Sequence, residues 1–127
     1  IVEENKLLGF TYISLFKNFV YLIYFAIEKT ERNKNYGSKA LKKIDKMFKN
    51  KSKILSVEVP SAKNGIQMKR INFYEKNGFS LADFQFDWNE QLLCIMFKEK
   101  FDKNIFLDFL LANFPTCKNF KPLKLEF

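Results

Sequence analysis

The chain has 127 residues, of which 47% are hydrophobic and 16 are phenylalanine. This composition excludes a disordered chain and predicts one folded domain, because disordered sequences are poor in apolar side chains and this length is short for two domains. The formal net charge of +8 favours a polyanionic ligand: nucleic acid, an anionic membrane surface or a phosphate-rich cofactor. The first residue is Ile, so we expect the sequence to begin inside a longer gene product.

In chain order, the sequence first predicts an antiparallel hairpin. Residues 6–16 are rich in aromatic and β-branched side chains, as strands are. Lys17 and Asn18 form the expected turn, and Phe19–Ile27 is the partner strand. Because this second strand is apolar without alternation, we expect it to be buried on both faces in the centre of the sheet.

A polar turn, residues 31–38, then leads into an amphipathic helix, residues 39–49. Its apolar side chains fall on one face: Tyr36, Ala40, Leu41, Ile44, Met47 and Phe48. The other face is basic, since eight lysines and one acid, Asp45, lie between residues 34 and 53. Residues 54–59 alternate as a strand that ends before Pro60, so the whole unit predicts a right-handed crossover between parallel strands.

The second half of the chain predicts two more helices and a second hairpin. A helix is expected within residues 61–77, with a loose start around Asn64 and Gly65 and with Gly78 as its C-cap glycine. Residues 79–86 and 91–97 are the expected hairpin strands, joined by a turn at residues 87–90.

The C-terminal third predicts a helix over residues 102–114, with Asp102 as N-cap and Pro115 after its end. Residues 118–127 are either a further strand or an arm. The phenylalanines of this region exceed what one small domain readily hides and indicate a homodimer surface; they are Phe101, Phe106, Phe109, Phe114, Phe120 and Phe127.

Cys94 and Cys117 lack the spacing of a metal site, and no histidine is present to complete one. We expect reduced thiols, although a disulfide between the two stays open. The apolar run Phe19–Ile27 is too short to span a bilayer, and no signal peptide is recognisable. The expected location is cytoplasmic, with no metal and no membrane partner.

The polar turn between the buried strand and the first helix is typical of an anion site. Backbone N–H groups and the positive end of the helix dipole converge at such a helix N-terminus. We therefore interpret residues 31–38 as the binding site for a pyrophosphate.

Two motifs resemble the GNAT superfamily of N-acetyltransferases. Arg32-Asn33-Lys34-Asn35-Tyr36-Gly37 is similar to the Arg/Gln-x-x-Gly-x-Gly/Ala turn that binds coenzyme A in that family. The segment Arg70 to Phe79 is similar to its FYEKxGF ending. The resemblance is close over residues 19–79. It implies an α/β (α+β) fold with a mixed, largely antiparallel central sheet flanked by helices, in a single domain that lacks the family's first strand and helices.

The resemblance also implies acetyl-coenzyme A as cosubstrate and a primary amine as acceptor, with direct attack and no covalent intermediate. Tyr74 resembles the tyrosine that protonates the departing thiolate. The cofactor-binding residues that it implies are Phe25, Ala26, Ile27, Arg32, Asn33, Lys34, Asn35, Tyr36, Gly37, Ser38 and Gln67.

Two departures from the family pattern stand out. The first glycine of the turn is Asn35, which tolerates a left-handed backbone better than bulkier residues. The glutamate that many members carry on the preceding strand has no counterpart at Leu22, Ile23 or Tyr24, and the nearest acids are Glu28 and Glu58. The sequence therefore identifies no general base.

Two other functions remain open. One is a degenerate GNAT-like domain that binds coenzyme A or a partner without catalysis. The other is a basic nucleic-acid-binding module that uses residues 34–53, which is disfavoured because the aromatic side chains lie in apolar strands and helix faces and not among exposed basic residues.

Overall fold

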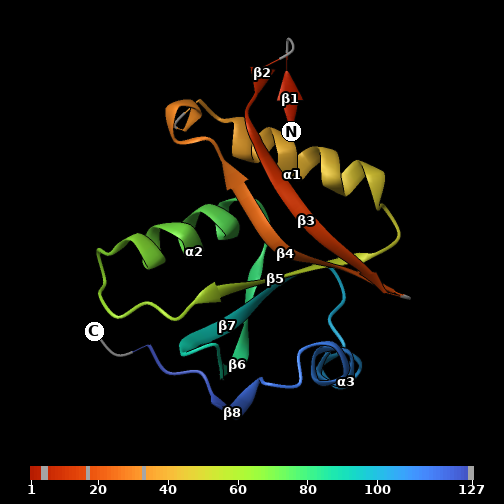
Figure 1. Cartoon of the computed structure of the whole chain (residues 1–127), viewed down its shortest axis with the longest axis vertical. Coiled ribbons are helices and arrows are strands. Elements are labelled where there is room, and N and C mark those ends of the chain that lie inside the picture. The colour runs from red at the N-terminus through yellow and green to blue at the C-terminus, as the bar shows by residue number, and fades with distance from the viewer. Residues whose placement is uncertain (4–5, 17, 33, 126–127) are drawn as a thin grey trace. The chain divides into compact units, whose positions relative to one another are not determined.

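A computed structural model of the chain describes residues 1–3, 6–16, 18–32 and 34–125 (Figure 1). Six strands follow one another in the hydrogen-bonded order β3-β4-β5-β7-β6-β8, and the β4–β5 pair is parallel, whereas the β3–β4, β6–β7 and β6–β8 pairs are antiparallel. The predicted α+β class with a mixed, largely antiparallel sheet is confirmed. The chain divides into two compact units, Ile1–Leu55 (unit 1) and Ser56–Phe127 (unit 2), and each is described by itself.

Unit 1 begins with two short paired strands, β1 (Val2–Glu3) and β2 (Lys6–Leu7). The hairpin of β3 (Gly9–Phe16) and β4 (Phe19–Ile27) follows, as predicted, with Phe16 opposite Phe19. Lys17 of the predicted turn lies outside the described residues. The predicted strand over residues 6–16 is interrupted at Leu8, which is buried and whose carbonyl accepts a hydrogen bond from the Glu28 N–H.

Strand β4 changes its surroundings halfway along its length. Residues 19–22 are buried and pair in parallel with residues 52–55 of β5 (Ser52–Glu58). Residues 23–27 extend past that pairing and lie along β3, and the Tyr24 side chain is 62% exposed. The prediction of burial on both faces is therefore confirmed for the first four residues and wrong for Tyr24, because a sheet face is covered only where other elements pack on it.

Helix α1 (Tyr36–Met47) connects β4 to β5 and buries Leu41 and Ile44. Met47, predicted on the buried face, is 67% exposed. The helix ends there, and the half-buried Phe48 follows with a backbone φ of −125° that is no longer helical. Strand β5 starts two residues earlier than predicted, because the N–H and the hydroxyl of Ser52 both donate to the Asn18 carbonyl.

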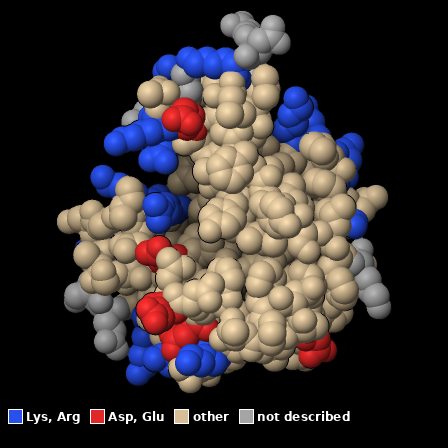
Figure 2. Space-filling model, in the orientation of Figure 1, with Lys and Arg blue, Asp and Glu red and all other residues tan. Residues whose placement is uncertain are grey.

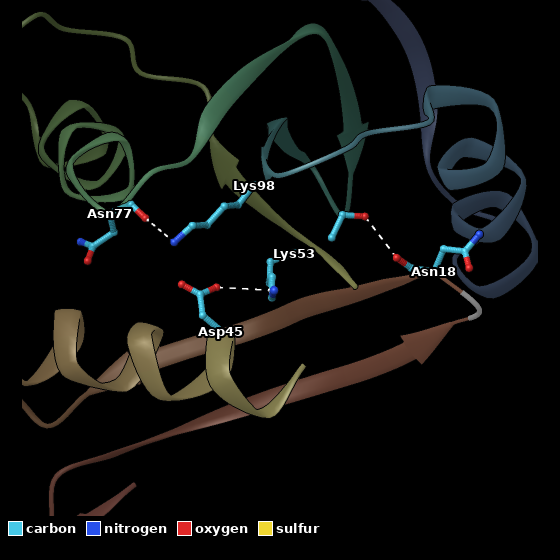
Figure 3. A network of polar contacts seen from close by, with 6 residues as sticks. Asn18, Asp45, Lys53, Asn77 and Lys98 are labelled. Atoms are coloured by element: carbon cyan, nitrogen blue, oxygen red, sulfur yellow. Dashed lines mark hydrogen bonds and ion pairs between the residues drawn. The ribbon is translucent and has the colours of Figure 1, made fainter. Parts of the chain in front are cut away.

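Lys53 lies in the core of unit 1. Its side chain is 1% exposed, and its Nζ lies 3.7 Å from Oδ1 of Asp45 on α1 (Figure 3). The sequence places Lys53 among the basic surface residues, and this is wrong, because its position in β5 turns the side chain inward. A buried ammonium group requires a counter-charge, and Asp45 supplies one.

Unit 2 contains α2 (Ile66–Lys76), which begins after its N-cap Gly65, where the start of this helix was predicted. Gly78 follows the helix with a positive φ of 94°, as predicted for a C-cap glycine. Nζ of Lys98 donates to the carbonyl of Asn77 at 3.1 Å and so neutralises this helix end (Figure 3).

The second hairpin of unit 2 joins β6 (Ser80–Trp88) to β7 (Gln91–Lys98). Its turn consists of Asn89 and Glu90, both with positive φ, so it is two residues tighter than the predicted turn at residues 87–90. The strand β8 (Lys118–Pro122) pairs antiparallel with β6, which decides between the predicted strand and arm in favour of a strand.

Helix α3 (Lys103–Asn113) begins as predicted, with Oδ1 of Asp102 accepting from the Ile105 N–H at 3.1 Å. Phe106 and Phe109 on this helix are 0% and 5% exposed, and the rings of Phe97 and Phe101 stack with centroids 4.9 Å apart. The argument for a homodimer from exposed phenylalanines is therefore wrong for Phe106 and Phe109, whereas Phe120 is 37% exposed, and Phe127 lies outside the described residues. The homodimer itself stays a prediction.

We predict that Asp45→Ala lowers the free energy of unfolding by about 3 kcal/mol, because it leaves the buried Lys53 ammonium without this counter-charge. Lys53→Met, which removes the buried charge, should cost about 1 kcal/mol or less. Urea denaturation followed by circular dichroism measures both, with the exposed Asp108→Ala as control. Equal losses for the Asp45 and Lys53 variants would contradict a charge-pairing role.

Candidate functional site

The predicted anion site in unit 1 starts where β4 ends. After Ile27, a single turn of 3-10 helix (Lys29–Glu31) reverses the chain towards α1. Asn35 precedes α1 as its N-cap, with φ 65° and ψ 14°, which is the left-handed region. A left-handed backbone was predicted at this position, and Asn is one of the few non-glycine residues that adopts one at low cost. Asn33 lies outside the described residues.

The N-terminus of α1 presents backbone N–H donors. The first intrahelical hydrogen bond runs from the Lys39 N–H to the Asn35 carbonyl at 3.2 Å, so the N–H groups of Tyr36, Gly37 and Ser38 precede it. The Asn35 side chain makes no capping hydrogen bond, and the first turn carries no acidic residue. These donors and the helix dipole favour an anion at this end of the helix.

Basic residues lie close in sequence to this helix end. Nε of Arg32 donates to the Ile27 carbonyl at 3.1 Å, which fixes the guanidinium between the end of β4 and the turn. Lys34 is exposed, and Nζ of Lys39 lies 5.5 Å from the centre of the Tyr36 ring. Together with the backbone donors, these charges suit a diphosphate.

The end of β4 is a continuous backbone segment leading into the turn. Phe25, Ala26 and Ile27 are half-buried and pair with β3 at Thr11, Phe10 and Gly9. The residues between positions 25 and 38 that the sequence predicts to bind the cofactor therefore lie, as far as they are described, in one strand–turn–helix segment of unit 1.

In unit 2, Tyr74 lies on α2 in an aromatic setting. Its ring meets those of Phe73 and Phe79 edge-on, with centroids 5.2 and 5.8 Å apart. Burial raises the pKa of Tyr74 above its ordinary value of 10.0, while the positive charge of Arg70, one turn earlier, acts in the opposite direction. The phenol therefore keeps its proton at neutral pH and is suited to donate it.

A carboxylate held by two amides lies near the start of the same helix. Nε2 of Gln67 donates to Oε2 of Glu58, and Nε2 of Gln91 donates to Oε1, each at 3.4 Å. Glu58 is half-buried at the end of β5. Gln67 and Tyr74 are seven residues apart, which places them on one face of α2.

The sequence marks Glu58 only as a nearby acid and does not identify Gln67 and Gln91 together as its two partners. Gln67 was expected to contact the cofactor arm, whereas its amide lies against Glu58. Gln91 is the first residue of β7, thirty-three residues from Glu58. No local pattern marks such a long-range contact, so only the pairing of strands and the position of α2 reveal it.

The two cysteines are unsuited to nucleophilic catalysis. Cys94 and Cys117 are free and buried. Burial raises the pKa of the Cys94 thiol to about 12 and that of Cys117 to about 11, so both stay protonated at neutral pH. Among the described residues, no group of three or more His, Cys, Asp or Glu side chains is arranged to hold a metal ion.

Comparison with known families identifies the class of protein. Residues 1–81 match the family described as "Acetyltransferase (GNAT) domain". This match covers more than half of the chain, so the chain belongs to the GNAT acetyltransferase domains, as the two sequence motifs suggested. Members of this family use acetyl-coenzyme A.

Solved structures share the fold. A protein assigned to the GNAT acetyltransferases of Bacteroides thetaiotaomicron is 24% identical with a TM-score of 0.72, over 90% of this chain and 70% of its own. The PaiA N-acetyltransferase of Thermoplasma acidophilum, in complex with coenzyme A, is 22% identical with a TM-score of 0.60, over 78% of this chain and 57% of its own. The ribosomal-protein-S18-alanine N-acetyltransferase of Escherichia coli is 17% identical with a TM-score of 0.61, over 81% of this chain and 69% of its own. No curated protein sequence matches the chain significantly.

The residues of unit 1 fit the diphosphate of coenzyme A. The N-terminus of α1 offers backbone donors that no acidic side chain of the first turn neutralises. Basic residues adjoin it in sequence, and the backbone at Asn35 has the positive φ that glycine adopts without cost.

In the described part of the chain, no helix is long and apolar enough to cross a membrane.

Proposed function

We propose that this domain transfers the acetyl group of acetyl-coenzyme A directly to a primary amine. The observation that carries the proposal is the N-terminus of α1, which follows a left-handed Asn35 and lacks both a side-chain cap and an acidic first turn. Family membership supports it. The acceptor, whether a small molecule or a protein, and the cytoplasmic location remain predictions from the sequence.

The residues of unit 1 are proposed to bind and orient the cofactor. The N–H groups of Tyr36, Gly37 and Ser38 would donate to the diphosphate, and Arg32 and Lys34, with Asn33, would surround it with donors and positive charge. The backbone of Phe25, Ala26 and Ile27 would lie along the cofactor arm, where one N–H polarises the acetyl carbonyl. When bound, acetyl-coenzyme A supplies an activated acetyl thioester. Gln67 remains a candidate contact to the cofactor arm.

Unit 2 is proposed to handle the protons of the reaction. Tyr74, with its raised pKa, holds the proton that the leaving sulfur needs. Glu58 is the candidate group that accepts a proton from the amine, because hydrogen bonds from Gln67 and Gln91 fix its carboxylate. Gln67 also lies on the same face of α2 as Tyr74. The two amide donors set the orientation of this carboxylate.

A second candidate function is cofactor or partner binding without catalysis. Asn35 in place of the family's glycine and the apolar residues Leu22 and Ile23 in place of its glutamate favour this alternative. Turnover decides between the two, because a binding domain has none to lose.

We predict that Tyr74→Phe lowers kcat by about a hundredfold, a usual contribution of a general acid, with the dissociation constant for acetyl-coenzyme A unchanged. The drop should be equal at pH 7 and pH 9, because a phenol with a raised pKa stays protonated at both. A thiol-release assay and isothermal titration calorimetry measure the two quantities, and Tyr12→Phe, an exposed tyrosine of β3, is the matched control. Full activity of Tyr74→Phe would exclude this role.

For the cofactor turn, we predict opposite effects of two substitutions at Asn35. Asn35→Gly should bind acetyl-coenzyme A at least as tightly as the native chain, because glycine adopts a positive φ without cost. Asn35→Val should weaken binding about tenfold, since a β-branched residue in the left-handed region costs about 1–2 kcal/mol. Calorimetric titration measures both. Binding that is absent from the native chain at high micromolar cofactor would discard the proposed function.

For the amine, we predict that Glu58→Gln lowers kcat/KM by about a hundredfold while cofactor affinity is retained. The loss should shrink as the pH rises towards the pKa of the amine, because an acceptor that arrives neutral needs no base. The exposed Glu75→Gln on α2 is the isosteric control. A pH-independent loss would indicate that Glu58 only holds the structure.

A further inference from the structure

Most of the net positive charge of the chain lies in unit 1. Residues 1–55 contain twelve lysines and arginines against five acids, whereas residues 56–127 contain ten against nine. Such an asymmetry between halves of a chain suggests a polyanionic partner for the basic half. Figure 2 shows basic side chains around the margins of the surface near β3, whose centre is almost without charge.

The excess is concentrated on one face of α1. Lys39, Lys42, Lys43 and Lys46 are all exposed, and their spacings of three, four and seven residues place them within an arc of about 100°. Lys49, in the turn after the helix, continues the row. We call these five residues the α1 lysine face.

The acid of α1 does not neutralise this face. Asp45 is the only acidic residue of the helix, and its carboxylate lies 3.7 Å from the buried ammonium of Lys53. Lys53 therefore turns Asp45 inward and leaves a row of cations without an interleaved anion, which raises the local positive potential.

Three features distinguish among polyanionic partners. The apolar face of α1, with Leu41 and Ile44, is buried in unit 1, so the helix cannot insert it into a lipid surface. Interfaces with proteins are built around buried aromatic and apolar anchors and are depleted in lysine, unlike this face. Contacts to nucleic-acid phosphates require clustered lysine or arginine and no apolar anchor.

We propose that the α1 lysine face binds the phosphate backbone of a nucleic-acid duplex without reading its sequence. The five residues of the face are all lysines, and the half-buried ring beside them, Tyr36, lies 5.5 Å from Nζ of Lys39, so the face offers cations to the backbone and no row of rings on which bases could stack. The proposed activity towards amines does not require this binding, and the two are tested separately.

The test is fluorescence anisotropy of a labelled DNA duplex of about 20 base pairs, titrated with the full chain between about 50 and about 200 mM salt. We expect Lys42→Glu/Lys46→Glu to weaken binding at least about tenfold and to reduce the slope of log affinity against log salt by about two, because each phosphate contact contributes about 0.9. An RNA duplex and a shuffled DNA sequence should bind within about threefold of the first duplex, because only the backbone is contacted.

The control is Lys63→Glu/Lys100→Glu, which changes the net charge equally at two exposed positions outside α1. It should weaken binding less than about twofold at the salt concentrations used. An equal loss in both variants, the absence of binding by the native chain, or tighter binding to vesicles containing phosphatidylserine would each overturn the proposal. Circular dichroism and calorimetry with acetyl-coenzyme A confirm that Lys42→Glu/Lys46→Glu is folded, so failure of duplex binding is distinguishable from failure of the acetyltransferase proposal.

Discussion

The parallel pairing of residues 19–22 with residues 52–55 is the constraint on which unit 1 depends. Parallel neighbours cannot be joined by a tight turn, so the chain must cross over through a helix, and α1 supplies it. Because β4 runs five residues past this pairing, the crossover starts beyond the paired region, at Ile27. The turn and the N-terminus of α1 therefore lie at the carboxyl end of β4, and phosphate groups bind at the carboxyl ends of strands in α/β proteins.

The charged side chains of unit 1 differ in burial, and this difference decides which of them face solvent. One lysine, Lys53, is inside and draws the only acid of α1 towards the core, while the lysines on the outer face of the same helix remain in solvent. A single buried ion pair thus has two consequences. It joins α1 to β5 through their side chains, and it leaves one face of α1 purely cationic.

In unit 2, Tyr74 and Gln67 lie on one face of α2. The Tyr74 ring meets those of Phe73 and Phe79 edge-on, and burial raises the pKa of its phenol, which therefore keeps its proton at neutral pH. Two turns earlier on that face, Gln67 contacts Glu58, and Gln91 contacts the same carboxylate from the start of β7. Residues from a helix and two strands therefore define the carboxylate's position, which no single element could do.

Local patterns were enough for the hairpin of β3 and β4, the strand–helix–strand crossover, the Asp102 cap and Gly78, because each depends on neighbours within a few residues. The residue type at Asn35 likewise indicated its left-handed backbone, because Asn adopts this conformation more readily than bulkier residues. Long-range packing decided what the sequence could not: the burial of Lys53, the exposure of Tyr24 and Met47, and the Gln67–Glu58–Gln91 contact. Whether a side chain meets solvent or a partner distant in the chain depends on which elements cover it, and that is a property of the folded chain alone.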